Sequence, residues 1–387
     1  MKDVIYNKNT NIPIKMWLLE KDMEKGALDQ AKNLSNLPFA FKHIAIMPDS
    51  HQGYGVPIGG VLATKGVVIP HAVGVDIGCG MCANKTTIDA DDLDVGTLKE
   101  IMGEIRERVP VGFNWHDEEQ IHSLGFLGKY ENNSRYLKQL GTLGGGNHFI
   151  EIQKGDGGKI WVMIHSGSRK FGYNIAKRYN KKAKELNKKW HSSVPESWEL
   201  AFLPEKSKEG QTYIKEMNYA VDYALENRKI MMRRIKQAFE EVLEENYFID
   251  DMINIAHNYT RKEKHFGENI WVHRKGATSA KEGQLGIIPG SQGAKSYIVK
   301  GKGNEESFKS CSHGAGRTMS RTQAKKDIDL KQSQKKMEDK GIIHSVRNKG
   351  DLDEAPEAYK DISKVMSNQQ DLVDIEVELT PLGVIKG

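Results

Sequence analysis

The chain has 387 residues, with 57 Lys and Arg against 52 Asp and Glu, so its formal charge is +5. Hydrophobic residues make up 38% and charged residues 28%, which supplies a large apolar core and excludes a disordered chain. No run approaches the ~18 consecutive apolar residues of a membrane helix, and charges interrupt residues 1–25. We therefore expect a cytoplasmic protein with no signal peptide and no membrane partner.

Cysteine and glycine usage narrow the class further. The three cysteines, Cys79, Cys82 and Cys311, are an odd number in a long chain, which excludes a disulfide scaffold and favours a reduced compartment. The 38 glycines are concentrated in a few stretches, above all in Phe41–Cys82, which indicates loops with special backbone conformations. No linker, internal repeat or low-complexity tract divides the chain.

Apolar runs rich in Val and Ile, such as KIWVMIH and NIWVHRK, predict buried strands that end in polar loops. They lie in three stretches, Phe41–Lys85, Gly141–Gly172 and Trp271–Val299. Amphipathic periodicity predicts helices between and after them, over Asp92–Arg108, Gly172–Lys189, Tyr213–Glu245 and Thr318–Lys340. Functional side chains are expected where the strands end.

Two of these helical stretches are strongly basic. Lys177–Lys189 is rich in lysine, and Tyr213–Glu245 sets an apolar face with Tyr223 and Ile235 against Arg228, Arg233, Arg234 and Lys236. The first interpretation is a core helix with a solvated basic face. The second is a surface that faces RNA.

The segment GVDIGCGM, residues 74–81, is the strongest local signal. Asp76 and Cys79 lie three residues apart among glycines, in a sequence that favours a tight loop over a helix. A carboxylate and a thiolate brought together repel each other unless a cation lies between them, so we predict a divalent metal. A buried structural cysteine beside a turn aspartate is the alternative. We interpret Cys82 as a packing residue, because no second C-x-x-C completes a zinc site.

Five histidines stand in unusual surroundings. His148 follows three glycines, His165 and His257 follow apolar runs, and His273 and His313 lie in the segments WVHRKG and SCSHGAGR. A single histidine is more often hydrogen-bonded in a core or loop than bound to a metal. Three that adjoin apolar segments, together with Asp76 and Cys79, form a ligand set for one or two divalent ions, with zinc, manganese, iron and cobalt all compatible.

Three glycine-containing loops are suited to phosphate. They are Gly144–His148, His165–Gly172 and His313–Arg317, in which Arg169 and Arg317 are the natural bidentate donors. Tight turns capped by arginine are the alternative for each loop. No P-loop and no G-x-G-x-x-G between strand and helix occurs, so a Walker-type nucleotide site is not expected.

Nine segments in order, MPDSHQGYGVPIGG, GVDIGCGM, LGGGNHFIE, HSGSR, AHNY, VHRKGAT, PGSQG, SCSHGAGR and the terminal KG, resemble the motifs of the RtcB family of RNA ligases. The resemblance extends from about Phe41 to Gly387. It implies an α/β (α+β) fold, with mixed β-sheets and surrounding helices around one deep metal-binding cleft, in a single catalytic domain over residues 1–387.

The resemblance also implies a reaction that depends on GTP and Mn²⁺. RNA ends with a 2′,3′-cyclic phosphate or a 3′-phosphate are joined to RNA ends with a 5′-hydroxyl, in tRNA splicing or RNA repair. His313 matches the nucleophile that takes GMP. Two Mn²⁺ ions, which share the Cys79 thiolate, would be held by Asp76, Cys79, His148, His165 and His257. The guanylate-binding positions match Asn147, Phe149, Glu151, Asn258, Ser291, Gly314, Ala315, Gly316, Tyr359 and Lys386.

We expect Arg169 and Arg317 to hold RNA or nucleotide phosphates, and the protein to be a monomer. The first motif departs from other family members after its aspartate, so Asp49 and His51 are interpreted as structural or RNA-facing and left outside the catalytic set.

Two alternative functions remain. A metallophosphoesterase that hydrolyses RNA cyclic phosphates would not need His313, and an RNA-binding protein with structural metals would not turn over GTP.

Overall fold

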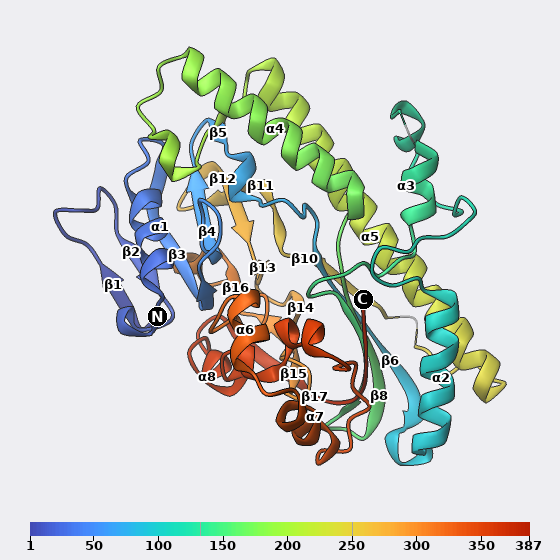
Figure 1. The fold of residues 1–387 in the computed structure, drawn as a ribbon. Coiled ribbons are helices and arrows are strands. Elements are labelled where there is room, and N and C mark those ends of the chain that lie inside the picture. The colour runs from blue at the N-terminus through green and yellow to red at the C-terminus, as the bar shows by residue number, and fades with distance from the viewer. Residues whose placement is uncertain (132, 250) are drawn as a thin grey trace.

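Two large β-sheets form the frame of the computed structural model, which describes residues 1–131, 133–249 and 251–387 (Figure 1). In spatial order, the six-stranded sheet contains β1 (Asp3–Ile5), β2 (Ile14–Met16), β3 (Ala40–His51), β4 (Ile58–Thr64), β12 (Glu268–Lys275) and β11 (Asn258–His265). The seven-stranded sheet contains β10 (Ile253–Ala256), β6 (Gly80–Asp89), β8 (Lys159–Ser166), β7 (Phe149–Gly155), β17 (Val373–Lys386), β15 (Ser296–Gly301) and β14 (Leu285–Ile288). Two short pairs complete the described strands, β13 (Ala277–Ser279) with β16 (Ser310–Ser312) and β5 (Val67–Val68) with β9 (Leu203–Pro204).

The apolar run in β8 illustrates why the central strands are buried on both faces. Val162 and Ile164 point into a cluster with Ile235, whereas Trp161 and Met163 pack in a second cluster on the opposite face. Side chains alternate along a strand, so a strand covered on both faces must be apolar at every position. This confirms the strands predicted from the Val- and Ile-rich stretches.

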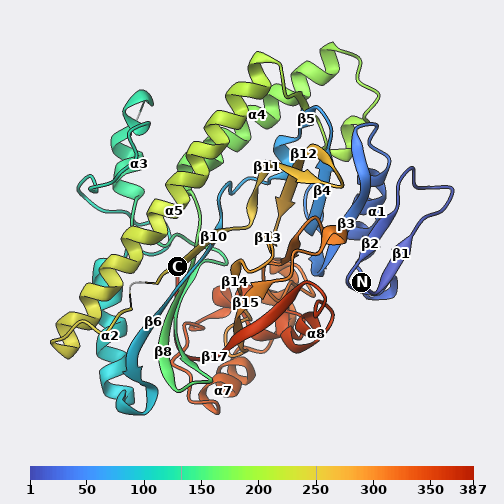
Figure 2. The same ribbon diagram turned by 180° about the vertical axis from the view of Figure 1, so that it is seen from behind.

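Helices cover the sheets, and the fold is therefore α+β as expected. They are α1 (Lys25–Ser35), α2 (Val95–Arg108), α3 (Asn133–Gln139), α4 (Arg169–Lys189), α5 (Lys208–Leu243), α6 (Arg321–Asp327), α7 (Leu330–Glu338) and α8 (Ile362–Ser367). Figures 1 and 2 show α4 and α5 running side by side along one edge of the molecule. No helix in the described ranges combines the length and apolar character needed to cross a membrane.

Three of the four predicted helices are confirmed as α2, α4 and α5. The fourth, over Thr318–Lys340, is wrong as a single element, because α6 and α7 are separate. Ile328 has extended backbone angles, and the Asp329 side chain accepts a hydrogen bond from the Gln332 N–H as the N-cap of α7. An aspartate inside a periodic pattern thus starts a new helix instead of continuing the old one.

Arg228 corrects the interpretation of the basic face of α5. This side chain is fully buried, whereas Arg233 on the same helix is exposed. The guanidinium donates to the carbonyls of Gly78 (3.0 Å) and Ser166 (2.7 Å), and to Asn254 Oδ1 (2.8 Å). Arg228 therefore ties α5 to the segments around β6, β8 and β10, which carry the site described below.

Candidate metal centre and active-site cleft

The ends of four neighbouring strands bring the predicted metal ligands together. Cys79 directly precedes β6, His148 directly precedes β7, His165 lies near the end of β8, and His257 directly follows β10. The strand register sets His165 opposite residues 81 and 149, and residue 80 opposite residue 256. Because neighbouring strands lie about 5 Å apart, four ligands that are distant in sequence converge at one edge of the sheet.

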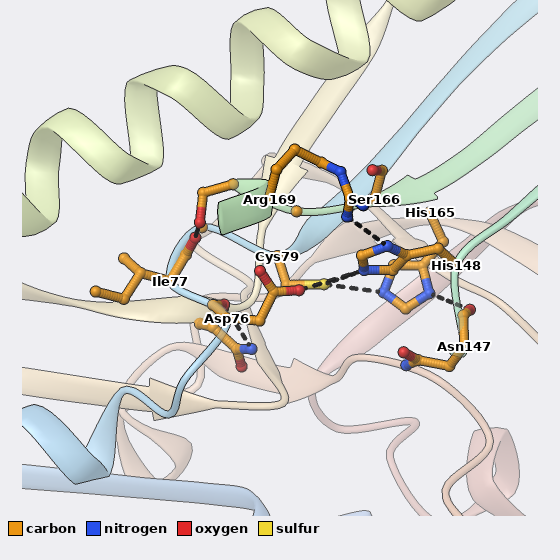
Figure 3. Close-up of polar contacts among 12 residues, drawn as sticks. Asp76, Ile77, Cys79, Asn147, His148, His165, Ser166 and Arg169 are labelled. Carbon is orange, nitrogen blue, oxygen red and sulfur yellow. Dashed lines mark hydrogen bonds and ion pairs between the residues drawn. The ribbon is translucent and has the colours of Figure 1, made fainter. Parts of the chain in front are cut away.

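Cys79 lies at the centre of this group. Its Sγ is 3.4 Å from Nε2 of both His148 and His165, and His148 Nε2 is 3.2 Å from Asp76 Oδ2 (Figure 3). Two sets of ligand atoms lie close enough to hold a metal ion, Cys79–His165–His257 and Asp76–Cys79–His148. They share Cys79, an arrangement suited to two neighbouring divalent ions.

Backbone carbonyls orient two of the imidazoles. His148 Nδ1 is 3.0 Å from the Leu143 carbonyl, and His165 Nδ1 is 3.0 Å from the Asn147 carbonyl. An Nδ1–H that donates to a carbonyl leaves the Nε2 lone pair free for a cation. His257 Nδ1 is buried without a hydrogen-bond partner in the described part of the chain. The donor set therefore fits a divalent metal.

Electrostatics favour the same interpretation. Burial, together with the nearby histidines, holds the pKa values of His165 and His257 well below their usual range, so both imidazoles are neutral. Burial raises the pKa of the Cys79 thiol well above its usual range, and the Asp76 charge adds to this effect. Burial also opposes ionisation of Asp76, but hydrogen bonding to His148 and Cys79 outweighs it and lowers that pKa to about 2. A bound cation would release the thiol proton and balance both anions.

His313 lies at the far end of a row of imidazole rings. Ring centroids are 4.8 Å apart for His313 and His257, 5.2 Å for His257 and His165, and 5.3 Å for His165 and His148. His313 Nδ1 is 2.6 Å from Asp49 Oδ2, and the His313 backbone N–H donates to the same oxygen at 3.1 Å. An Nδ1–H that donates to Asp49 leaves the lone pair of Nε2 free.

The structural interpretation of Asp49, and not the RNA-facing one, agrees with its position in the structure. Asp49 is completely buried and does not face solvent or RNA, and its partner is 264 positions away. Gly316 makes this contact possible: its φ is +74°, and a Cβ there would lie 2.0 Å from the Asp49 carbonyl oxygen. His51 lies beside this pair and accepts a long hydrogen bond (3.5 Å) from the Arg317 N–H. No local pattern signals the Asp49–His313 pair.

One cleft joins His313 to the candidate metal ligands Asp76, Cys79, His148, His165 and His257, which together we call the metal-binding group. Its walls include all ten positions matched to guanylate binding, with Asp76, Cys79, His165, His257, His313 and Arg317. His148 and Arg169 are not in this lining and lie behind it. The Arg169 guanidinium lies 3.3 Å from His148 Nδ1. Figure 3 marks this contact with a dashed line. Arg169 thus adjoins the candidate metal ligands and not the part of the cleft lined by the positions matched to guanylate binding.

Glu354 organises the wall opposite the metal-binding group and was not identified from the sequence. This buried carboxylate accepts hydrogen bonds from Arg317 (3.3 Å) and the Tyr359 hydroxyl, and it forms an ion pair with Arg321 (3.2 Å). Lys386 Nζ lies 4.0 Å from it and donates to the Gly146 carbonyl at 2.7 Å. Glu354 therefore links the predicted residues Arg317, Tyr359 and Lys386, together with Arg321, in one network of hydrogen bonds and ion pairs.

Other polar side chains of the site fix loops or pack. Asn258 accepts a hydrogen bond from the Gly276 N–H at 2.8 Å and donates to the Asp76 carbonyl at 3.1 Å, which ties the metal-binding loop to β11. His273 is buried, and its Nε2 accepts a hydrogen bond from the Ile69 N–H at 3.0 Å, so it is a structural histidine. Cys82 is buried in an apolar cluster, which confirms its interpretation as a packing residue.

Comparisons with known proteins show the family of the chain. The sequence model of a family described as tRNA-splicing ligase RtcB matches residues 30–126 and 127–387. The RNA-splicing ligase RtcB of Escherichia coli (strain K12) is 41% identical to the chain, in an alignment that covers 97% of the chain and 98% of that protein. The tRNA-splicing ligase RtcB of Nanoarchaeum equitans is 34% identical, with 97% and 96% covered. For the tRNA-splicing ligase RtcB of Methanococcus maripaludis the identity is also 34%, with 96% and 93% covered. The chain therefore belongs to the RtcB family of RNA ligases.

Proposed function

We propose that this chain is a GTP- and Mn²⁺-dependent RNA ligase that acts through a covalent His313–GMP intermediate. It joins RNA ends with a 2′,3′-cyclic phosphate or 3′-phosphate to 5′-hydroxyl ends, in tRNA splicing or RNA repair, and residues 1–387 work as one catalytic domain. The observation that carries the proposal is His313, held by Asp49 in a cleft that adjoins two candidate sets of metal ligands. An imidazole held in this way can act as a nucleophile that carries GMP, whereas a hydrolase would use it as a general acid or base, and uptake of GMP from GTP separates the two.

In the first step, His313 Nε2 attacks the α-phosphorus of GTP. An N–P bond forms, the bond from the α-phosphorus to the bridging oxygen breaks, and pyrophosphate leaves. Asp49 stabilises the positive charge that develops on the ring, because its carboxylate accepts the Nδ1–H at 2.6 Å. Lys386 and Glu151, which line the cleft, are proposed to contact the guanylate.

The RNA then takes the guanylyl group. Water opens a cyclic phosphate to a 3′-phosphate, whose oxygen attacks the phosphorus on His313, so that the N–P bond breaks and the imidazole is restored. The 5′-hydroxyl next attacks the RNA 3′-phosphorus, and GMP leaves with the electron pair of the broken P–O bond. Arg317, which lines the cleft, is proposed to hold phosphates during these steps. Arg169 lies outside the lining beside His148, so we do not propose the phosphate contact that the sequence led us to expect for it.

The two candidate sets of metal ligands described above are proposed to hold the Mn²⁺ ions. Bound divalent ions supply Lewis acidity and neutralise phosphate charge. The protein's own part is to keep the histidine ligands neutral and oriented, as the carbonyl contacts of His148 and His165 do.

The test is ligation of an RNA that carries a 2′,3′-cyclic phosphate at one end and a 5′-hydroxyl at the other. With GTP and Mn²⁺ we expect a joined or circular product, no product with ATP, and none with His313→Ala. Opening of the cyclic phosphate without GTP and without joining would support the hydrolase instead. No change in the RNA, with metal still bound, would support the structural RNA-binding protein.

A further inference from the structure

A groove outside the catalytic cleft runs along α4. One wall is formed by the loop that contains His71 and Val75, and the other by Tyr173, Lys177, Lys181 and Lys184 of the helix. In Figure 1 the blue chain that follows β5 passes beneath α4, and the helix packs against the short turn at residues 70–72. We call this hollow the α4 groove.

The α4 groove leads to the metal-binding group. Val75 is the residue before Asp76, and Arg169, which begins α4, lies 3.3 Å from His148 Nδ1. The row of imidazoles places His313 at the opposite end of the group, 4.8 Å from His257. A strand that followed the groove would therefore arrive at the metal-binding group from the side away from the proposed nucleotide site.

The helical wall carries a straight line of positive charge. Lys170, Lys177, Lys181, Lys184 and Lys188 are spaced by seven, four, three and four residues, which sets them on one helix face. Lys184 is paired with Glu199, and Lys181 lies 3.9 Å from Glu185, but Lys177 has no ion-pair partner among residues 1–131, 133–249 and 251–387. A second hollow shares Lys184 and continues past Lys188 to His191, so the line spans ~27 Å of helix.

Aromatic rings are interspersed with these charges. The Tyr173 side chain is 39% exposed, and Lys170 Nζ lies 4.4 Å from its ring centroid. Next to the other wall, Tyr54, which is 76% exposed and lies outside the lining of the groove, stacks on His71 of that wall with 6.3 Å between centroids and an interplanar angle of 18°. Lysines that follow a backbone and exposed rings on which bases stack are the combination that binds single-stranded nucleic acid. In a duplex the base faces are covered by their neighbours.

We propose that the α4 groove binds the single-stranded RNA that leads to the reacting end, with Lys177 and Lys181 on its phosphates and Tyr173 stacked on a base. This inference rests on the proposed function and adds to it the path of the substrate. Neither lysine nor Tyr173 belongs to the catalytic cleft.

The test compares two charge reversals on the same helix. Lys177→Glu/Lys181→Glu alters the α4 groove, whereas Lys182→Glu/Lys189→Glu alters two exposed lysines that are not in its lining and changes the net charge by the same amount. Binding of a labelled single-stranded RNA of about 12 nucleotides is measured by fluorescence anisotropy over a range of salt, without GTP. We expect the first pair to weaken binding about 10-fold or more and to reduce the salt slope by about 1.4, and the second pair to stay within about 2-fold of wild type.

Equal weakening by both pairs would overturn the inference, since the effect would then be one of net charge alone. Normal binding by the Lys177→Glu/Lys181→Glu variant would overturn it as well. Tyr173→Ala separates stacking from charge: it should weaken single-stranded RNA about 5-fold and leave an RNA duplex of the same length unaffected. An equal loss for both RNAs would contradict the stacking.

Uptake of GMP, measured in the absence of RNA, tests the proposed function independently of RNA binding in the α4 groove. Every variant should take up GMP from GTP and Mn²⁺ as wild type does and unfold at the same temperature, because the α4 groove is not in the catalytic cleft. If wild type takes up no GMP, the proposed function fails, whether or not RNA binds in the α4 groove. If wild type takes up GMP but the groove reversal binds RNA normally, only the groove assignment fails.

Discussion

The contact between Asp49 and His313 determines which nitrogen of the imidazole would act as the proposed nucleophile. In Asp49→Asn the amide can donate to Nδ1, which would shift the ring proton to Nε2 and occupy the nucleophilic lone pair. We expect guanylylation at least ~100-fold slower than in wild type, with the fold retained. A time course of intact mass with GTP and Mn²⁺ measures this rate. A variant that reacted at the wild-type rate would show that Asp49 is only a packing residue.

Glu151, in the cleft, makes the free energy of unfolding of the protein depend on pH. Burial raises the pKa of this carboxyl from its ordinary value of 4.5 to about 8, against the opposing effects of Gln153 and Lys386. Between those values the folded protein holds a proton that the unfolded chain has released. Its free energy of unfolding therefore falls by about 1.4 kcal/mol per pH unit as pH rises.

Glu151→Gln cannot ionise and should lack this part of the slope. Urea denaturation gives the free energy of unfolding of wild type and of Glu151→Gln at about pH 6 and pH 8. The difference between the two proteins isolates the contribution of Glu151, because all other titrating groups are common to both. The advantage of wild type over the variant should shrink, or reverse, toward pH 8. Parallel pH dependences would contradict a raised pKa for Glu151.

Residues that act beside their own apolar run or glycine loop could be predicted from the sequence. Cys79, His148, His165 and His257 lie at or next to strand ends, Asp76 lies in the loop before β6, and the structure brings the five residues together. Asp49 and Glu354 could not be predicted, because each acts on residues that only the tertiary fold brings near.

At the level of elements, α5 supports the metal-binding loop through Arg228. Arg228→Ala leaves the buried carbonyls of Gly78 and Ser166 without their donor, and we expect it to destabilise the protein by about 3–5 kcal/mol. Arg233→Ala, at an exposed position of the same helix, should stay within about 0.5 kcal/mol of wild type. Urea denaturation measures both. Similar effects of the two substitutions would contradict the supporting role of Arg228.

Periodicity predicted where α2, α4 and α5 lie, but it could not identify which arginine of α5 is buried. A buried arginine and an exposed one have the same polar character in the sequence, and burial depends on the carbonyls that surround it. The break between α6 and α7 was missed for a similar reason, since Asp329 is compatible with either a solvated helix or a cap.

For the whole molecule, the shared Cys79 predicts how metal binding and stability are coupled. A ligand that binds only the folded state stabilises it by about 2.7 kcal/mol at 100 times its Kd. We expect wild type to bind two Mn²⁺ ions, His257→Ala to lose one, and Cys79→Ala to lose both, because Cys79 belongs to both ligand sets. Calorimetric titration gives the stoichiometry, and unfolding temperature with and without Mn²⁺ gives the stabilisation. Two ions bound by Cys79→Ala would contradict a shared ligand.

The most direct measurement is the intact mass of the purified protein after incubation with GTP and Mn²⁺, beside His313→Ala and an ATP control. We predict that wild type gains the mass of one guanylyl group with GTP, whereas the variant and the ATP sample gain nothing. Acid lability and alkali stability of the adduct would identify a phosphoramidate. An adduct on His313→Ala, or no adduct on wild type that has bound its metal, would contradict a covalent role for His313.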